Sequence, residues 1–220
     1  MVDKDNRKLS LSLVWFLLTL IAIVALSAIG PAEKSLGTNV RVVYLHGAWV
    51  WTALIAYIAA GITGYLGLVL GRQVLQLWSR ALGRTGLLFW LTYLPLSMWA
   101  MQANWNGLFL AEPRFKFAIV FSVTGILLQI GVTLMENPAW ASGANMMFVV
   151  ALFLALSSTE NVMHPPSAIL DSEAIRIQLY FGGLILLVLL AAYQIARGLY
   201  KVDRRSLELS EDRELESVRS

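Results

Sequence analysis

The chain has 220 residues, of which 58% are hydrophobic and 14% are charged, and its mean hydropathy is +0.67. These values exclude a soluble domain of ordinary composition and indicate a polytopic membrane protein. The chain contains no cysteine and carries a formal net charge of +3. It therefore offers no cysteine pair, and the charge gives no reason to expect a nucleic-acid partner.

Six stretches are apolar enough to cross a bilayer as helices, which takes about 20 residues each. They cover about residues 11–30, 43–70, 86–109, 116–135, 140–158 and 177–198. Because the first is long for a signal peptide and lacks a clear cleavage site, we expect it to be retained. The sequence thus predicts an all-α fold, a bundle of six transmembrane helices over residues 1–200. The charged residues 201–220 predict a cytoplasmic tail, either a solvated helix or disordered.

The distribution of lysine and arginine predicts the orientation of this bundle. With a cytoplasmic N-terminus, the inner side collects twelve of them: Lys4, Arg7, Lys8, Arg72, Arg80, Arg84, Arg197, Lys201, Arg204, Arg205, Arg213 and Arg219. The outer side then carries only Lys34, Arg41, Arg114, Lys116 and Arg176. We therefore expect both termini in the cytoplasm and outer loops at about residues 31–42, 110–115 and 159–176.

Both histidines of the chain fall at the outer face in this topology. His46 lies about one turn inside the second predicted helix. His164 precedes Pro165 and Pro166, which forbid a continuing helix and favour an extended loop. Two imidazoles at one membrane face are the minimum set that holds a haem iron from both sides. The alternative is that each is an interfacial or packing residue, the commoner role of a lone histidine at a helix end.

The cations of the outer loops run against the usual excess of positive charge on the inner side. Arg41, Arg114 and Arg176 have guanidinium groups that suit the two propionates of a haem. The alternative is that they snorkel or pair with neighbouring acidic residues. The residues expected to open the last helix are Asp171 or Ser172 as its cap and Glu173 in its first turn.

Four tryptophans gather toward the outer half of the predicted bundle: Trp49, Trp51, Trp99 and Trp105. For at least two of them we favour the ordinary aromatic belt at the headgroup level. Glycines of the second segment that we assign to close helix packing are Gly61, Gly64, Gly67 and Gly71.

The order of these features resembles the CcmC-type haem-handling proteins of cytochrome c maturation, also called haem exporter protein C. The resemblance is carried by residues 44–49, with their histidine, by residues 105–114, an aromatic segment that closes on an acid-x-Arg, and by the His-Pro loop 162–167. It covers about residues 11–198. The family's aromatic segment is richer in tryptophan and has aspartate where this chain has Glu112.

The resemblance implies that His46 and His164 are the axial ligands of a non-covalently held, transiently bound haem b. It also implies that the porphyrin lies near Trp49, Trp99 and Trp105, in a bacterial or archaeal cytoplasmic (inner) membrane. The implied partners are a periplasmic membrane-anchored haem chaperone, the ABC transporter subunits of the maturation system, and the bilayer. We therefore expect a protein that binds haem and presents it to a periplasmic acceptor, and not an enzyme.

Two other classes of function remain open at this point. One is a b-type electron carrier or membrane anchor with two histidine ligands, although a histidine in a Pro-Pro loop argues against ligands fixed within a bundle. The other is a transporter or scaffold without haem. Intramembrane charge would favour a transporter, but only Glu136, near the inner end of the fourth helix, comes close.

Overall fold

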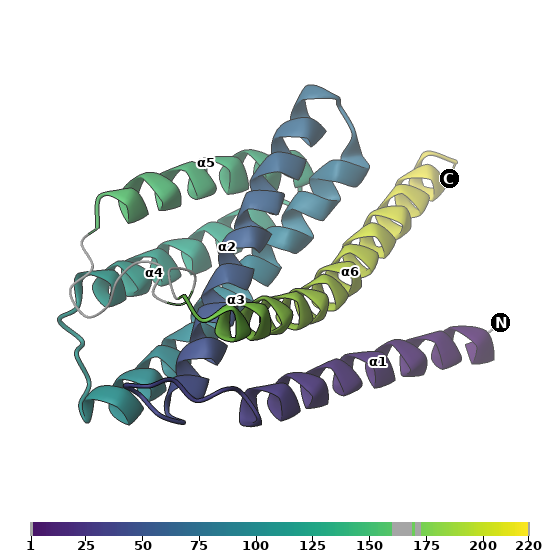
Figure 1. The fold of residues 1–220 in the computed structure, drawn as a ribbon. Coiled ribbons are helices and arrows are strands. Elements are labelled where there is room, and N and C mark those ends of the chain that lie inside the picture. The colour runs from purple at the N-terminus through teal and green to yellow at the C-terminus, as the bar shows by residue number, and fades with distance from the viewer. Residues whose placement is uncertain (1, 160–168, 170–172, 220) are drawn as a thin grey trace. The chain divides into compact units, whose positions relative to one another are not determined.

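The computed structural model describes residues 2–159, 169 and 173–219, and within them the fold is all-α (Figure 1). The predicted all-α class is therefore confirmed for this part of the chain. The described residues form six helices: α1 Val2–Ala28, α2 Val40–Val69, α3 Gln73–Trp105, α4 Pro113–Leu134, α5 Pro138–Ser157 and α6 Ile175–Arg219.

Five of these helices, all except α3, are long and apolar enough to cross a membrane. The described residues thus support five spans by composition, where the sequence predicted six. The predicted segment at 86–109 is helical as far as Trp105, but tryptophan, tyrosine, proline and glutamine side chains interrupt its leucines. Pro95 lies inside this helix.

The turn between α2 and α3 is much shorter than the sequence predicted. Gly71 adopts a positive φ of 61°, and the Arg72 amide donates to the Gly67 carbonyl at 3.0 Å, which closes α2. Because α3 begins at Gln73, Arg80 and Arg84 lie on that helix and not in an inner loop.

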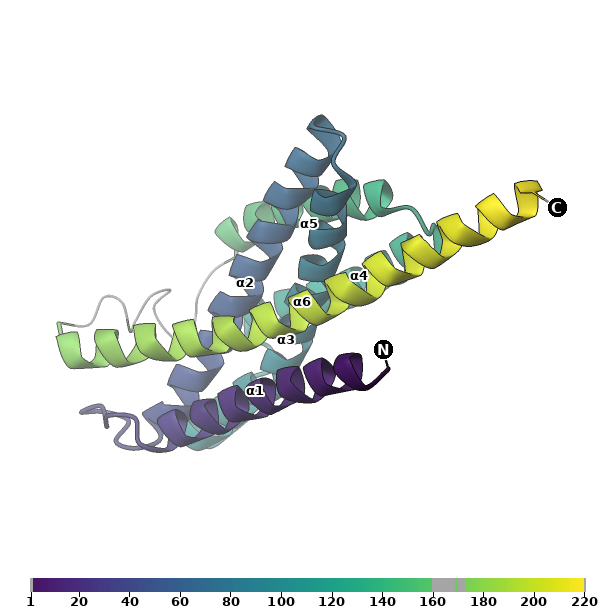
Figure 2. The ribbon, with the colours of Figure 1, turned by 90° about the vertical axis from the view of Figure 1, so that its right-hand side faces the viewer.

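The last helix also differs from the prediction at both ends. It begins at Ile175, so Glu173 lies before the helix and not in its first turn, while Asp171 and Ser172 lie outside the described residues. At the other end, α6 continues as one helix to Arg219 (Figure 2). Of the two alternatives for the tail, the helix is the one observed over residues 201–219.

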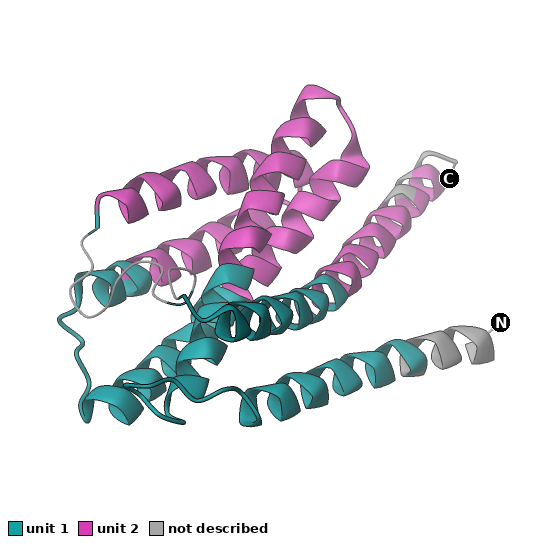
Figure 3. Cartoon of the chain, viewed as in Figure 1, with its two compact units in different colours: residues 1–52, 89–119, 159–194 teal, residues 53–88, 120–158, 195–220 magenta. Residues whose placement is uncertain are grey.

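The chain forms two compact units (Figure 3). Unit 1 comprises residues 1–52, 89–119 and 159–194, and unit 2 comprises residues 53–88, 120–158 and 195–220. Helices α2, α3, α4 and α6 each contribute one part to either unit, so most helices are shared and neither unit is a continuous stretch of chain.

The core of unit 1 joins α2 to α6 through aromatic rings. The Tyr44 side chain is fully buried, and its ring lies 5.3 Å from that of Tyr180 and 6.4 Å from that of Phe181. The Tyr180 hydroxyl donates to the Leu26 carbonyl at the end of α1, at 2.9 Å. These contacts fix the first turns of α2, which carry His46.

The core of unit 2 is built around a buried amide. Asn145 on α5 donates to the Ser79 carbonyl at 2.9 Å and accepts from the Gln129 amide at 3.0 Å. The helices approach closely here, since a Cβ on Gly83 would stand 2.5 Å from Asn145. Within the bilayer such side-chain hydrogen bonds join helices that gain little from hydrophobic burial.

The glycines of α2 have two different roles. A Cβ added to Gly61, Gly64 or Gly67 would lie 2.6–2.9 Å from Val149, Ser142 or Gln76, so their predicted role in close packing is confirmed. Gly71 meets nothing within 4 Å, and its positive φ shows that it serves the turn. The packing role predicted for Gly71 is therefore wrong.

An ion pair in unit 2 holds the predicted tail against α3. Asp203 is 8% exposed and accepts from Arg84 Nη1 at 2.9 and 3.2 Å. Arg84 Nη2 also donates to Thr133 of α4 at 3.2 Å, and Arg80 Nε lies 3.9 Å from Asp203. The start of the predicted tail is therefore packed against its unit, not solvated on all sides.

We expect Asp203→Ala to lower the free energy of unfolding by about 1–3 kcal/mol, because it leaves two partly buried guanidinium groups without their carboxylate. The measurement is the midpoint of thermal unfolding in detergent, followed by circular dichroism. Glu208→Ala is the control: it breaks an exposed pair with Arg204 on the same helix, worth about 0–0.5 kcal/mol. Equal midpoints for both variants would contradict the structural role of Asp203.

Candidate functional site

The site lies in unit 1, where the connection between α1 and α2 leads into His46. Glu33 and Gly37 exchange backbone hydrogen bonds of 3.1 and 2.8 Å, and Gly37 has a positive φ of 55°. The Glu33 carboxylate accepts from the Ser35 hydroxyl and from the amides of Ser35 and Leu36. The hydrogen bond from the Ser35 hydroxyl, followed by those amides, lowers the pKa of Glu33. Its charge therefore stabilises this turn at neutral pH.

The start of α2 is also tied to the end of α3. The Asn39 side chain donates to the Ala103 carbonyl at 2.9 Å, and Asn104 donates to the Asn39 carbonyl at 3.4 Å. Arg41 Nε donates to the Gly30 carbonyl at 2.9 Å. The first turns of α2 are therefore held from two directions before the chain reaches His46.

His46 is half-buried in the second turn of α2 and faces α3. Its ring lies 5.6 Å from the ring of Tyr93 at an angle of 58°. Tyr93 is 7% exposed and stands edge-on to Trp90 at 5.0 Å. Trp90 is fixed in turn by a hydrogen bond of 3.1 Å from its indole nitrogen to the Ala118 carbonyl of α4. We name Phe89, Trp90 and Tyr93 of α3 the aromatic wall, and His46 packs against its Tyr93 ring.

Trp49 lies one turn after His46 and contacts the same helix. Its indole nitrogen donates to the Thr92 hydroxyl at 3.0 Å, and its ring lies 5.2 Å from that of Phe89. Since this hydrogen bond occupies the indole nitrogen, Trp49 is a second residue, after His46, that joins α2 to α3.

Arg114 approaches the aromatic wall from the first turn of α4. Its side chain is half-buried and lies within electrostatic range of Tyr93 and Glu112. Its Nε atom is buried and has no hydrogen-bond partner among the described residues. A buried guanidinium nitrogen without an acceptor is costly, and a carboxylate would satisfy it.

Three other predicted site residues, Trp99, Trp105 and Arg176, make no ring contact or hydrogen bond with this wall in the described part of the chain. Trp99 is 58% exposed, and its six-residue separation from Tyr93 places it on a different face of α3. Trp105 is half-buried at the end of α3, and Arg176 is exposed in the first turn of α6. His164 lies outside the described residues.

The aromatic wall, which consists of Phe89, Trp90 and Tyr93, was not predicted from the sequence. A signal for it was present, because these residues follow one another at positions i, i+1 and i+4 in the predicted third segment and so share one side of a helix. The sequence does not show that α2 packs against this side of the helix, and this packing is what places His46 next to Tyr93.

The donor set fits one side of a haem. His46 supplies an imidazole nitrogen, a common axial ligand of haem iron, next to aromatic rings that offer an apolar surface. Arg114 supplies a buried donor without an acceptor, which suits a propionate. No group of three or more His, Cys, Asp or Glu side chains in the described part of the chain could hold a bare metal ion.

A comparison with known proteins relates the chain to cytochrome c biogenesis. The chain is 28% identical over 106 residues to a curated protein of Marchantia polymorpha, described as a ccmC-like mitochondrial protein of cytochrome c biosynthesis. The aligned region is 48% of this chain and 46% of that protein, so the chain matches about half the length of its relative. No family model matches the chain. The chain is therefore a distant relative of a ccmC-like cytochrome c biogenesis protein.

Proposed function

We propose that this protein binds haem b at one face of the membrane through His46 and His164 and presents it to an acceptor during cytochrome c maturation. The observation that carries the proposal is the packing of His46 against the Tyr93 ring, with the Arg114 guanidinium, whose Nε has no acceptor, within electrostatic range of Tyr93. The distant relationship to a ccmC-like protein supports the process. On this proposal the protein is a haem-handling protein and not an enzyme.

The roles of the residues follow from their chemistry. A neutral imidazole at His46 would ligate the iron, and the Tyr93 ring limits the rotation of that imidazole. Arg114 would hold a negatively charged propionate, and Trp90 keeps Tyr93 in place. When bound, haem would supply an iron that accepts imidazole ligands and two propionates. His164 is the second ligand in this proposal, and Arg41, Arg176, Trp99 and Trp105 keep the roles toward the propionates and the porphyrin that the resemblance implies.

Delivery requires other proteins, because the chain has no Walker-type phosphate-binding loop. A membrane-anchored haem chaperone and the ABC transporter subunits of a maturation system are the proposed partners. The proposed location is an energy-transducing inner membrane, either the cytoplasmic membrane of a prokaryote or, as for the relative, a mitochondrial one.

The experiment that tests the proposal directly is a titration of haemin into the detergent-purified protein. We expect saturable binding with the absorption spectrum of a low-spin haem b with two imidazole ligands. A spectrum that stays that of free haemin in detergent would contradict the proposal.

The proposal also requires that the His46 end of the protein faces the acceptor. We expect Ser158→Cys to react with a membrane-impermeant thiol reagent from outside intact cells and Ser206→Cys to remain unlabelled until the membrane is opened. Both serines are exposed, whereas Ser79 is fully buried and would stay unlabelled on either side. The natural chain has no cysteine, so the background is clean. Labelling of Ser206→Cys alone in intact cells would invert the topology.

A further inference from the structure

Four exposed cations in the middle of α6 lie on one side of the helix. We name them the basic patch; it consists of Arg197, Lys201, Arg204 and Arg205. At about 100° per residue, all four lie between roughly 100° and 200° around the helix axis from Asp203. The basic patch is thus opposite the one acidic side chain that this part of α6 buries.

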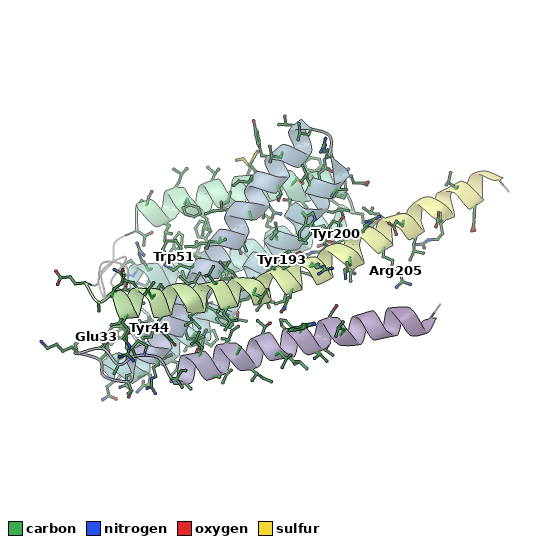
Figure 4. All side chains as sticks on the ribbon, turned by 45° about the vertical axis from the view of Figure 1, so that its right-hand side comes forward. Glu33, Tyr44, Trp51, Tyr193, Tyr200 and Arg205 are labelled. Carbon is green, nitrogen blue, oxygen red and sulfur yellow. The ribbon has the colours of Figure 1, made fainter. Side chains whose placement is uncertain are left out.

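Contacts within unit 2 fix this rotation of α6. Asp203 accepts two hydrogen bonds from Arg84, and Ala196, on nearly the same side of the helix, is fully buried. Tyr200 stacks on Trp78 with ring centroids 4.7 Å apart and an interplanar angle of 11°. Figure 4 labels Tyr200 and Arg205 along this stretch of α6. With the buried side held by α3, the basic patch faces outward.

The position of the basic patch along α6 matches the edge of a bilayer. Residues 177–196 carry no charged side chain, and at 1.5 Å per residue they span about 30 Å, the thickness of the hydrocarbon core. Tyr193, which is 52% exposed, lies in the last turn of this stretch, as aromatic residues at a membrane interface do. Arg197 is the first cation after it, and Arg205 follows about 12 Å further along.

We propose that the basic patch binds the phosphate headgroups of anionic phospholipids in the bilayer that α6 spans. Its charge complements the phosphates, and it continues directly from an apolar stretch of the right length. Each basic residue at an anionic surface raises the affinity about fivefold. Arg204 contributes least, since Glu208 accepts from it at 2.9 Å. Arg197, Lys201 and Arg205 therefore carry most of the binding.

The test uses the full chain reconstituted in phosphatidylcholine vesicles that contain spin-labelled phosphatidylglycerol or spin-labelled phosphatidylcholine. Electron paramagnetic resonance measures the fraction of each lipid immobilised by the protein, and the ratio gives the relative association constant. We expect a preference for phosphatidylglycerol of at least about fivefold in the natural protein, the effect of one basic residue, and none in Arg197→Gln/Lys201→Gln/Arg205→Gln. Glu208→Gln should raise the preference, because it frees Arg204.

The matched control, Lys34→Gln/Arg213→Gln/Arg219→Gln, removes the same charge elsewhere and should keep the preference. The triple variant should keep the unfolding midpoint of the natural protein, because the Asp203 pair is untouched. An unchanged preference in the triple variant, or an equal loss in the control, would overturn the proposal. A third outcome would also overturn it: the preference is lost when inorganic phosphate is added but persists in chloride of equal ionic strength. The basic patch would then be a site for free phosphate.

Discussion

Replacement of His46 by alanine is expected to weaken haem binding by roughly a hundredfold or more, which is about 2.7 kcal/mol at 25 °C. The variant removes the one imidazole in the described chain that packs against the aromatic wall, while Tyr93, Trp90 and Arg114 remain. The measurement is the haemin titration of the purified protein, in which the low-spin spectrum should be lost as well as the affinity. A purely structural role for His46 would lower stability without this change in the spectrum.

Two further variants make this prediction specific. Leu45→Ala, at the neighbouring half-buried position on another side of α2, should bind haem like the natural protein. His46→Gly should recover the low-spin spectrum when free imidazole is added, because the small ligand replaces the missing side chain. Haem binding by His46→Ala equal to that of the natural protein would reject His46 as a ligand.

Deletion of the gene is expected to abolish the covalent attachment of haem to c-type cytochromes, provided that no paralogue is present. His46→Ala should fail to restore it, whereas Trp105→Ala should keep most of its haem spectrum and still deliver poorly. Trp105 ends α3 away from the aromatic wall, at a position suited to a partner and not to the iron. The measurement is haem staining of periplasmic or intermembrane cytochromes c after denaturing electrophoresis, next to the haem content of each purified variant.

This experiment separates haem delivery from the alternatives that the sequence left open. An electron carrier with two histidine ligands would leave haem attachment intact on deletion and would instead slow respiratory reduction. A haem-free transporter or scaffold would show neither haem binding nor a dependence on His46. Normal staining of c-type cytochromes in the deletion strain would reject the maturation role.

Arg114 illustrates how the structure changes the design of such variants. From the sequence, Arg114 and Trp105 belong to one segment between two helices and are expected to act together. The structure places Arg114 within electrostatic range of Tyr93, whose ring packs against His46, so its removal should affect haem retention as well as delivery. Trp105→Ala alone is therefore the cleaner probe of transfer.

The sequence by itself determined the class and the elements of this protein. Long apolar stretches can satisfy their backbone in a bilayer only as helices, and four of the six described helices begin within three residues of the predicted segments, the exceptions being α1 and α3. Local packing was also predicted from the sequence: the spacing of Gly61, Gly64 and Gly67 indicated a side of α2 that another helix approaches closely. Such features depend on neighbours within a turn or two of the same helix.

Only the tertiary structure decided which side chains meet. The indole of Trp49 bonds Thr92 across 43 residues of sequence, and Arg84 bonds Asp203 across 119 residues. The aromatic wall beneath His46 and the packed start of the predicted tail both depend on such pairs. The physical reason is that helical periodicity reveals which side of a helix is apolar, but not which other helix will cover it. Partner choice depends on the fit of small residues and buried polar groups between helices, and these come together only in the folded chain.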